Sequence, residues 1–599
     1  MRRIVAVVAV LAAALGVAAP QALAAKGPDA KGPKDKDTRV QLLAFNDFHG
    51  HLEPTTPGTI QIGCCVPNAT NTAWTPRTVP AGGVEYFATH LKGLRTANTN
   101  TITVGAGDLI GASPLISGLF HDEPAIHSLN ALGLDVSGVG NHEFDEGLQE
   151  LYRMQFGGCT APDHCVVEPF PGAIFQYLAA NVVREGTDET ILPAYEIRKI
   201  GNAKIAFIGL TLEATPTIVT PSGVAGLTFL PEVATTNALV ETLRNEQGVR
   251  SFVVLLHQGG FQNPPSPGPF TSPPNPDGYT DVNRCVNFGG SEIKAIAAGI
   301  DSRVKVIVSG HTHAPYICPN FDGTGKLLTS ASSFGRVITD IDLVIDHQSK
   351  DITTAVARNV IVTQDVAKDP ALTAIVDRYR SASAPIANQV VGAITADITR
   401  TGNSAGESAL GDVIADAQLK ATQPSDFGGS VIAFMNPGGI RSDLLFSASP
   451  GGEAPGQVTY GELFTVQPFG NSLVVKTCTG AQIDALLEQQ IYPTTRILQV
   501  SNGFTYSFNA SAPAGSRVDP ASIKLNGTTL SPATGYRVTM NSFLASGGDG
   551  FTVFNECTNA LGGEIDLDAL VRYFQQYADG VPPLEPVPPG PQNRITRVG

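Results

Sequence analysis

Polar residues that can bind metal ions follow five predicted strands, at the point where each β-branched run ends. They are Asp47 and His49 in FNDFHGH, Asp108 in GAGDLIG, Asn141 and His142 in GVGNHEFD, His257 in FVVLLHQGG, and His311 and His313 in SGHTH. Because ligands gather at the carboxyl ends of strands in α/β folds, we expect these side chains to meet. Imidazole and carboxylate groups suit Zn²⁺, Mn²⁺ or Fe, and an amide oxygen fits a hard ion. An Asp shared between two ions would hold them about 3.5–4 Å apart, so the pattern predicts a two-metal centre.

From Thr38 to about Asp346, short β-branched runs alternate with helical stretches, which is a mixed α/β pattern. The strand candidates include 40–45, 101–104, 204–210, 252–256 and 304–308, and Asn141 and His142 follow Val136. A Pro-rich stretch at 261–278 predicts a surface loop, and a helix is predicted at 367–387. A second α/β block follows, from about 390 to 579. With 599 residues the chain is too long for a single core, so at least two domains are expected.

The chain is acidic, with a net charge of −15 and a pI near 5.2. An acidic surface repels a polyanion, which argues against a nucleic-acid polymer as partner. A small phosphorylated substrate is compatible with this charge, because bound metal ions supply positive charge locally. Hydrophobic residues make up 42% of the chain and charged residues 16%, so there is enough apolar material for cores and global disorder is excluded.

The N-terminus has the three parts of a secretory signal peptide. Arg2 and Arg3 form a basic start, an apolar run covers 4–19, and Ala22-Leu23-Ala24 is a cleavage signal. The run is shorter than the ~20 residues of a membrane span, so we expect cleavage rather than anchoring. Residues 586–599 are Pro-rich and polar and carry neither a membrane span nor a lipid-anchor signal. The predicted location is extracellular or in the cell envelope.

Eight cysteines in an exported chain predict disulfides. The expected pairs are Cys159 with Cys165, Cys285 with Cys318, and Cys478 with Cys557. Cys64 and Cys65 are adjacent, and their pairing is left open. The absence of CxxC spacing argues against the alternative, a cysteine metal site.

The order of the strand-end motifs, D-x-H, G-D, G-N-H-E, a strand-ending His and G-H-x-H, closely resembles the calcineurin-like metallophosphatase family. Each motif alone has a simpler explanation, such as a turn or a capping His, and the resemblance rests on their combination. It implies a four-layer αββα sandwich that binds two divalent ions, with zinc, manganese and cobalt as candidates. The first ion would be held by Asp47, His49, Asp108 and His313, and the second by Asp108, Asn141, His257 and His311. Asp108 would bridge them.

His142 is not expected to bind a metal. The resemblance implies that it faces the phosphate, where it stabilises the transition state or protonates the leaving oxygen. Asp145 lies three residues further on, in NHEFD, and can hold the imidazole charged and in one tautomer. The alternative for Asp145 is an acid at a helix N-terminus without a catalytic role.

Three motifs in the second block could bind a nucleotide. They are the turn Asn436-Pro-Gly-Gly439-Ile-Arg441, the turn Gln467-Pro-Phe469-Gly470, and the loop Asn541-Ser-Phe543-Leu-Ala-Ser-Gly-Gly-Asp549. Taken alone, a Phe in such a loop is more often a core residue, and NPGG is a common turn. Together the motifs resemble the C-terminal domain of the 5′-nucleotidase family, and the likeness extends over nearly the whole mature chain. It implies that Phe469 and Phe543 stack on the base. It further implies that Asp549 binds the ribose, and that Asn436, Gly439 and Arg441 contact the substrate.

Two positions depart from the family pattern. Many members have an Arg directly before the Glu of a segment like GESALGDVIADA, and here Gly406 precedes Glu407. Arg400 lies six residues earlier and is the candidate substitute. Some periplasmic members have Gln where this chain has His313, a difference that bears on metal preference.

The sequence therefore predicts a signal peptide at 1–25, a metallophosphatase domain at 38–362, a linker helix at 363–388 and a C-terminal 5′-nucleotidase domain at 389–580. A hinge near 365–385 would let the second domain carry substrate to the metals.

The predicted reaction is secreted, metal-dependent hydrolysis of nucleoside 5′-monophosphates. Alternatives on the same site are a 2′,3′-cyclic nucleotide phosphodiesterase and a UDP-sugar or NAD pyrophosphatase. The third alternative is a non-catalytic surface protein that binds nucleosides. In such a protein we would expect some of the metal-binding residues to be absent. Substrate preference, metal identity and oligomeric state are left open.

Overall fold

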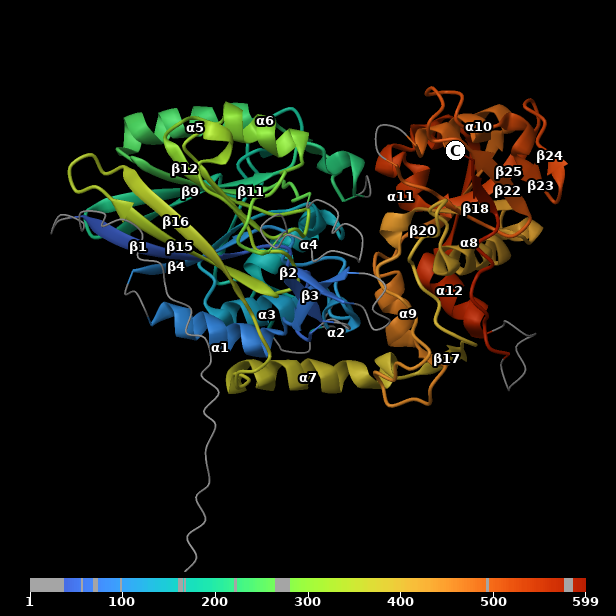
Figure 1. Cartoon of the computed structure of the whole chain (residues 1–599), viewed down its shortest axis with the longest axis horizontal. Helices are drawn as coiled ribbons and strands as arrows, with labels where there is room; N and C mark the ends of the chain where they lie inside the picture. The colour runs from blue at the N-terminus through green and yellow to red at the C-terminus, as the bar shows by residue number, and fades with distance from the viewer. Residues whose placement is uncertain are drawn as a thin grey trace, which may run out of the picture.

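The computed structural model describes residues 37–598, except 55–57, 68–73, 97–99, 160–164, 166–168, 220–222, 264–280, 492–494 and 576–584. The predicted signal peptide, nearly all of the predicted Pro-rich loop and the side chain of Cys64 fall outside the described part. Two folded blocks are joined by a long helix (Figure 1). Within the described ranges, no helix combines the length and the hydrophobicity needed to cross a bilayer.

Two six-stranded sheets form the centre of the first block. The first sheet has the order β16-β15-β1-β4-β5-β6, with β1 (Thr38–Phe45), β4 (Thr101–Ala106), β5 (Val136–Gly138), β6 (Gln176–Leu178), β15 (Val337–Ile345) and β16 (Ile352–Ile361). The second has the order β13-β14-β12-β11-β9-β8, with β8 (Tyr195–Ile200), β9 (Ala203–Thr211), β11 (Ser251–His257), β12 (Val304–Ser309), β13 (Tyr316–Cys318) and β14 (Leu327–Ser330). β1, β4, β5 and β6 run parallel, as do β9, β11, β12 and β14, so within each sheet their carboxyl ends share one edge.

Alternate residues of each strand enter different cores, as the pleat of a strand requires. On β1, Leu42 and Ala44 enter the core between the two sheets, where Phe207 and Leu255 of the second sheet also lie. Leu43 belongs to the core on the opposite face, under the helices. Each sheet therefore buries both of its faces, which explains why its strands read as nearly continuous apolar runs.

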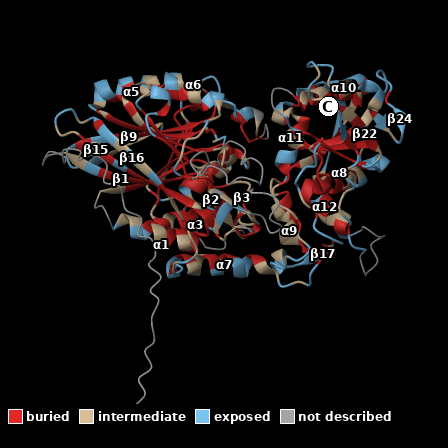
Figure 2. Cartoon of the chain, viewed as in Figure 1, coloured by how far each residue is buried: buried red, intermediate tan, exposed pale blue. Residues whose placement is uncertain are grey.

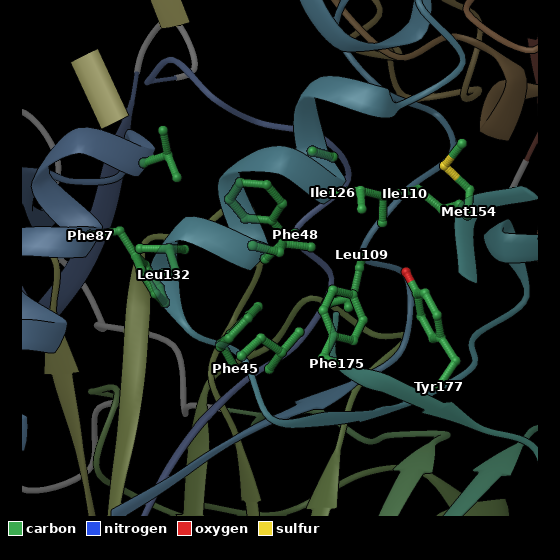
Figure 3. Close-up of a cluster of buried hydrophobic side chains, with 14 of the residues drawn as sticks. Phe45, Phe48, Phe87, Leu109, Ile110, Ile126, Leu132, Met154, Phe175 and Tyr177 are labelled. Carbon is green, nitrogen blue, oxygen red and sulfur yellow. The ribbon is translucent and has the colours of Figure 1, made fainter. Parts of the chain in front are cut away.

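Helices form the two outer layers. α1 (Val84–Arg95), α3 (Glu123–Leu132) and α4 (Leu148–Phe156) cover the first sheet, and α5 (Glu232–Gln247) and α6 (Ser291–Gly299) cover the second (Figure 1). Phe45 from β1 meets Phe87 from α1 edge to face, with ring centroids 5.2 Å apart, in the core under α1 and α3 (Figure 3). The block is an αββα sandwich, which confirms the predicted fold class.

The predicted linker helix is α7 (Pro370–Ala387). Asp369 caps its N-terminus by accepting hydrogen bonds from the backbone N–H groups of Ala371 and Leu372. The helix packs against the first block, because Tyr379 is fully buried and its hydroxyl lies 2.6 Å from Nδ1 of His127 on α3. It then runs along the first block toward the second (Figure 1).

The second block is built on a five-stranded sheet with the order β21-β18-β25-β20-β26. Its strands are β18 (Ile432–Met435), β20 (Ser472–Thr479), β21 (Gln499–Val500), β25 (Gly535–Asn541) and β26 (Thr558–Ile565). The helices used below are α8 (Ala409–Thr422), α9 (Tyr460–Val466), α11 (Ser542–Ala545) and α12 (Asp566–Gln575). Both blocks have a buried interior and an exposed shell of helix faces and loops (Figure 2).

The C-terminal strand β27 (Ile595–Arg597) pairs in parallel with β22 (Phe504–Phe508), in a sheet that also contains β23 (Lys524–Leu525) and β24 (Thr528–Thr529). Arg594 anchors this strand, because its guanidinium pairs with Asp416 on α8 at 2.8 Å. The folded second block thus extends to Arg597, beyond the predicted domain end at residue 580.

The three expected disulfides are present: Cys159–Cys165, Cys285–Cys318 and Cys478–Cys557.

Candidate active site

The carboxyl ends of β1, β4, β5, β11 and β12 bring the seven predicted metal ligands together. Asp47, His49, Asp108, Asn141 and His257 are at most 2% exposed. Ligand atoms of Asp47, His49 and His313 lie within 4.8 Å of one another, and so do those of Asp108, His257 and His311. The two triads correspond to the two predicted metal sites.

Five of these seven residues have a left-handed backbone, which L-residues other than glycine rarely adopt. The φ angles are 50° at Asp47, 48° at His49, 50° at Asp108, 73° at His311 and 57° at His313. Such conformations cost of order 1–3 kcal/mol each and are found where function requires a particular side-chain direction. Their concentration after the ends of β1, β4 and β12 indicates that the fold gives up stability to aim these side chains at one place.

In the triad of Asp47, His49 and His313, the potential ligand atoms lie close to one another. His49 Nε2 lies 3.1 Å from His313 Nε2, and His313 Nε2 lies 3.6 Å from Asp47 Oδ1. His49 Nε2 is also 3.6 Å from Asp108 Oδ2. Asp108 thus borders the first group of ligands as well as belonging to the second.

In the second group, His257 Nε2 lies 2.9 Å from Asp108 Oδ2, and His311 Nδ1 lies 3.0 Å from Asn141 Oδ1. Imidazole nitrogens that face one another, with carboxylate and amide oxygens at 2.9–3.0 Å, form a donor set that suits divalent ions.

The other ring nitrogens are held by the backbone. His49 Nδ1 lies 2.8 Å from the Gly111 carbonyl oxygen and His257 Nδ1 2.8 Å from that of Ala106, so each carbonyl accepts from Nδ1–H and leaves Nε2 to face the cluster. Burial lowers the pKa of His49 and His313, which keeps these rings neutral. Burial also lowers the pKa of His257, but the charges of Asp108 and Asp47 outweigh it and raise the pKa to about 9. Binding of an ion there would therefore release a proton.

Two supporting residues of the cluster were missed by sequence reasoning. Asn46 donates from Nδ2 to Asp47 Oδ2 at 2.5 Å and accepts from the Ala331 N–H at 2.8 Å, so it orients the Asp47 carboxylate. Glu143 is 2% exposed and accepts three backbone hydrogen bonds from the ligand loops. Both stand directly beside a motif residue, in FND and NHE, which is the only signal that could have found them.

His142 and Asp145 form the predicted dyad geometry. His142 Nδ1 lies 2.7 Å from Asp145 Oδ2, and the two side chains are 16% and 19% exposed. Burial lowers the pKa of His142, but Asp145 and Asp108 outweigh it and raise the pKa above its usual value. The His142 backbone N–H also donates to Asp108 Oδ1 at 2.9 Å, so the dyad and the metal cluster share a loop. The arrangement suits a charged imidazole beside a phosphate.

In the second block, a chain of hydrogen bonds holds the residue predicted to bind ribose. Asn541 Nδ2 donates to Asn436 Oδ1 at 2.9 Å, and Asn436 Nδ2 donates to Asp549 Oδ2 at 3.1 Å. Arg496 lies 3.7 Å from the other oxygen of Asp549. A Cβ on Gly439 would lie 2.5 Å from Met435 Cε and 3.0 Å from Asn436 Oδ1, so the turn packs closely beside Asn436.

The two predicted stacking residues differ in their surroundings. Phe469 follows α9 and lies against His142 of the first block, and the Arg441 guanidinium is 5.6 Å from its ring centroid. The Phe543 ring packs over Gly548, where a Cβ would lie 2.6 Å away. Phe469, Phe464, His142 and Asp145 line one cavity between the blocks, so the dyad and the nucleotide motifs share an interface.

The position of the missing family arginine is blocked. Gly406 has φ 84°, and a Cβ there would lie 2.7 Å from Ile497 Cγ1. Arg400 donates from Nη1 to the Ile440 carbonyl at 3.4 Å, next to Arg441. Burial and the nearby charge of Arg400 lower the pKa of Arg441. A second cation therefore lies beside Arg441, although it comes from a different position in the sequence.

The chain matches known families in both blocks. Residues 40–315 match the calcineurin-like phosphoesterase family, and residues 390–556 match the 5′-nucleotidase C-terminal domain. An endonuclease of Bacillus subtilis is 30% identical over 547 residues, which are 90% of this chain and 40% of that protein. A cell wall protein of Listeria monocytogenes is 31% identical over 565 residues, which are 90% of this chain and 67% of that protein. The chain thus spans less than half of the first relative and about two thirds of the second.

A solved structure resembles both blocks together. The crystal structure of a 5′-nucleotidase precursor from Thermus thermophilus covers 94% of this chain and 100% of its own, at 25% identity and a TM-score of 0.69. These matches confirm the resemblance found in the sequence motifs. The chain belongs to the 5′-nucleotidase family, with a calcineurin-like phosphoesterase domain followed by a 5′-nucleotidase C-terminal domain, and is a metal-dependent phosphoesterase.

Proposed function

We propose that this protein hydrolyses nucleoside 5′-monophosphates to nucleoside and phosphate, with two divalent ions held by Asp47, His49, Asp108, Asn141, His257, His311 and His313. The observation that carries the proposal is the contact between His142 and Phe469. It joins the metal cluster of the first block to the nucleotide motifs of the second in one interface. When bound, the ions supply positive charge for the phosphoryl oxygens and acidify water. Zinc, manganese and cobalt are the candidates.

The residues of the first block supply proton transfer. His142 Nδ1–H donates to Asp145, which leaves Nε2 for the substrate. With its raised pKa, the charged imidazole donates a proton from Nε2 to the leaving ester oxygen. Asp145 then keeps the ring in place and in the same tautomer through the cycle.

The residues of the second block supply substrate binding. Phe469 and Phe543 stack on the base, Asp549 accepts hydrogen bonds from the ribose hydroxyls, and Asn436 and Gly439 shape the turn between them. Arg441, with Arg400 beside it, pairs with the phosphate. Substrate entry requires the blocks to separate. The sequence predicts a hinge near 365–385, but that range lies largely within α7, which packs on the first block. We therefore place the hinge after the helix, at Asn388 and Gln389.

Export is part of the same proposal. The basic start, the apolar run and the Ala22-Leu23-Ala24 signal support removal of residues 1–25. One relative is a cell wall protein, and the disulfides of this chain suit an oxidising compartment.

A phosphodiesterase is the second candidate, because one relative is named an endonuclease and another a trifunctional nucleotide phosphoesterase, at 25% identity. The same attack at phosphorus serves a diester, a UDP-sugar or NAD, and only the leaving group differs. A non-catalytic surface protein is disfavoured, since every predicted ligand and both dyad residues are present.

The test is a substrate panel on the mature protein with Mn²⁺, Co²⁺ or Zn²⁺, and with EDTA as control. AMP, UDP-glucose, NAD, 2′,3′-cyclic AMP and p-nitrophenyl phosphate separate the candidates. The proposal predicts the highest kcat/KM for AMP and loss of all activities with EDTA or in Asp108→Ala. A higher kcat/KM for 2′,3′-cyclic AMP would favour the diesterase, and full activity of Asp108→Ala would refute the metal assignment.

A further inference from the structure

A buried carboxyl group lies between two loops that carry candidate metal ligands. Glu143 belongs to the short turn His142–Phe144 and is 2% exposed. Its neighbours on either side in sequence have other tasks, since His142 faces the cavity and Phe144 is in the core. A charged group this deeply buried is rare unless its oxygens are satisfied.

Backbone amides satisfy both of its oxygens. Oε2 accepts from the N–H of Asp108 at 3.0 Å and from that of Gly140 at 2.6 Å, and Oε1 accepts from the N–H of Leu109 at 2.8 Å. Asp108 and Leu109 belong to the loop after β4, and Gly140 belongs to the loop after β5. One carboxylate therefore links the two loops that carry the bridging ligand Asp108 and the amide ligand Asn141.

The linked loops are in direct contact and leave no room for adjustment. A Cβ on Gly140 would lie 2.2 Å from Asp108 Oδ1 and 2.5 Å from its backbone nitrogen. Asp108 has a left-handed backbone, with φ 50°. Consecutive amides such as those of Asp108 and Leu109 form a concavity that binds an anion. Here the Glu143 carboxyl group fills this concavity, and its three hydrogen bonds hold the strained backbone at Asp108 in place.

We propose that Glu143 is a positioning residue of the metal centre, which sets the distance between Asp108 and Asn141 and thereby the affinity for the bridged pair of ions. It acts through the backbone of the two loops. This inference rests on the proposed metal centre.

The test compares two Glu→Gln variants by chelator-competition titration of Zn²⁺ and Mn²⁺. In Glu143→Gln, one oxygen becomes an NH₂ group that opposes a backbone N–H, so the clamp loses at least one hydrogen bond. Loss of such an outer partner typically lowers metal affinity 10–100-fold, and we expect a loss in this range for Glu143→Gln.

The matched control is Glu232→Gln on α5, because Glu232 is 7% exposed and accepts the Glu213 N–H at 2.9 Å. The control is expected to bind both ions like the wild type.

Circular dichroism and the melting temperature of the metal-free proteins separate positioning from folding. A Glu143→Gln protein that melts lower but binds metal within twofold of the wild type would overturn the inference. If Glu143→Gln does not fold, Glu143→Asp takes its place, because it keeps the carboxyl group and shortens the side chain by one methylene. Reduced affinity of that variant supports the inference, and wild-type affinity overturns it. A wild type that binds no divalent ion would instead overturn the proposed metal centre.

Discussion

The phenyl ring of Phe469 lies nearly parallel to the imidazole of His142, with centroids 5.7 Å and planes 18° apart. The two residues belong to different domains. Arg441 lies 5.6 Å from the same ring. Phe469 therefore lies against His142 of the first domain as well as Arg441 of its own domain, and a role in base stacking alone does not account for its position.

Replacing Phe469 and Phe543 separately distinguishes these roles. An aromatic pair contributes about 0.5–1.5 kcal/mol, so Phe469→Ala should lower kcat for p-nitrophenyl phosphate about two- to tenfold, because His142 loses its neighbour. Phe543→Ala should leave that substrate unaffected and lower kcat/KM for AMP about tenfold, since stacking is worth about 1–3 kcal/mol per base. Steady-state kinetics on both substrates measure this. Equal losses on p-nitrophenyl phosphate in the two variants would contradict the assignment.

The contact between α2 (Leu115–Gly118) and α9 can be disturbed without touching the metal ligands. A Cβ on Gly118 would lie 2.9 Å from Phe464 Cζ across the domain interface. Gly118→Leu should hold the domains apart and lower kcat for AMP about three- to tenfold, with unchanged metal content. Gly93→Leu on α1 is the control, because no atom would lie within 4 Å of its Cβ. An unaffected kcat in Gly118→Leu would show that this contact has no part in turnover.

The clustering of the seven candidate metal ligands could be predicted, because strand-end positions follow from β-branched runs and the parallel strands of each sheet end at one edge. The residues that hold those ligands in place could not be predicted. Glu143 acts through backbone amides of two loops, and nothing in the letters NHE shows which amides it meets. The left-handed backbone at Asp47 and Asp108 is equally invisible, because glycine is the usual signal for that conformation.

The second domain was harder to predict than the first. The contact of Phe469 with His142 depends on how two domains dock, which no local pattern encodes. The strand β27 has only three residues, and it forms because Arg594 is anchored by α8 and β22 offers a free edge. By contrast, the short loop between Cys159 and Cys165 and the exported context indicate that disulfide. The structure also contains the other two expected pairs, Cys285–Cys318 and Cys478–Cys557, for which no local spacing argues.

Arg400 is expected to take the part of the arginine that Gly406 excludes. Arg400→Gln should lower kcat/KM for AMP about fivefold, a loss of about 1 kcal/mol, which is modest because the side chain is exposed and solvent screens its charge. The control Arg597→Gln removes an exposed cation from β27 of the same domain. A similar loss in both variants would point to net charge rather than to a phosphate contact.

Asp566 at the start of α12 should make stability depend on pH. Burial raises its pKa to about 7, so the folded state binds a proton more tightly than the unfolded state. Wild-type stability should therefore fall between the unfolded pKa near 4 and pH 7, and stay low above it. The Asp566→Asn variant has no carboxyl group at this position and should not lose this stability. Calorimetry should therefore show that the melting temperature of the variant minus that of the wild type increases from pH 4 to pH 8. A constant difference would refute the shift.

The most direct test of the account is anomalous diffraction from crystals grown with Mn²⁺ or Zn²⁺. We predict two ions about 3.5–4 Å apart. The Asp108 carboxylate should bridge them through one or both of its oxygens. One ion should contact Asp47, His49 and His313, and the other Asn141, His257 and His311. A single ion, or two ions that do not share Asp108, would contradict the central claim.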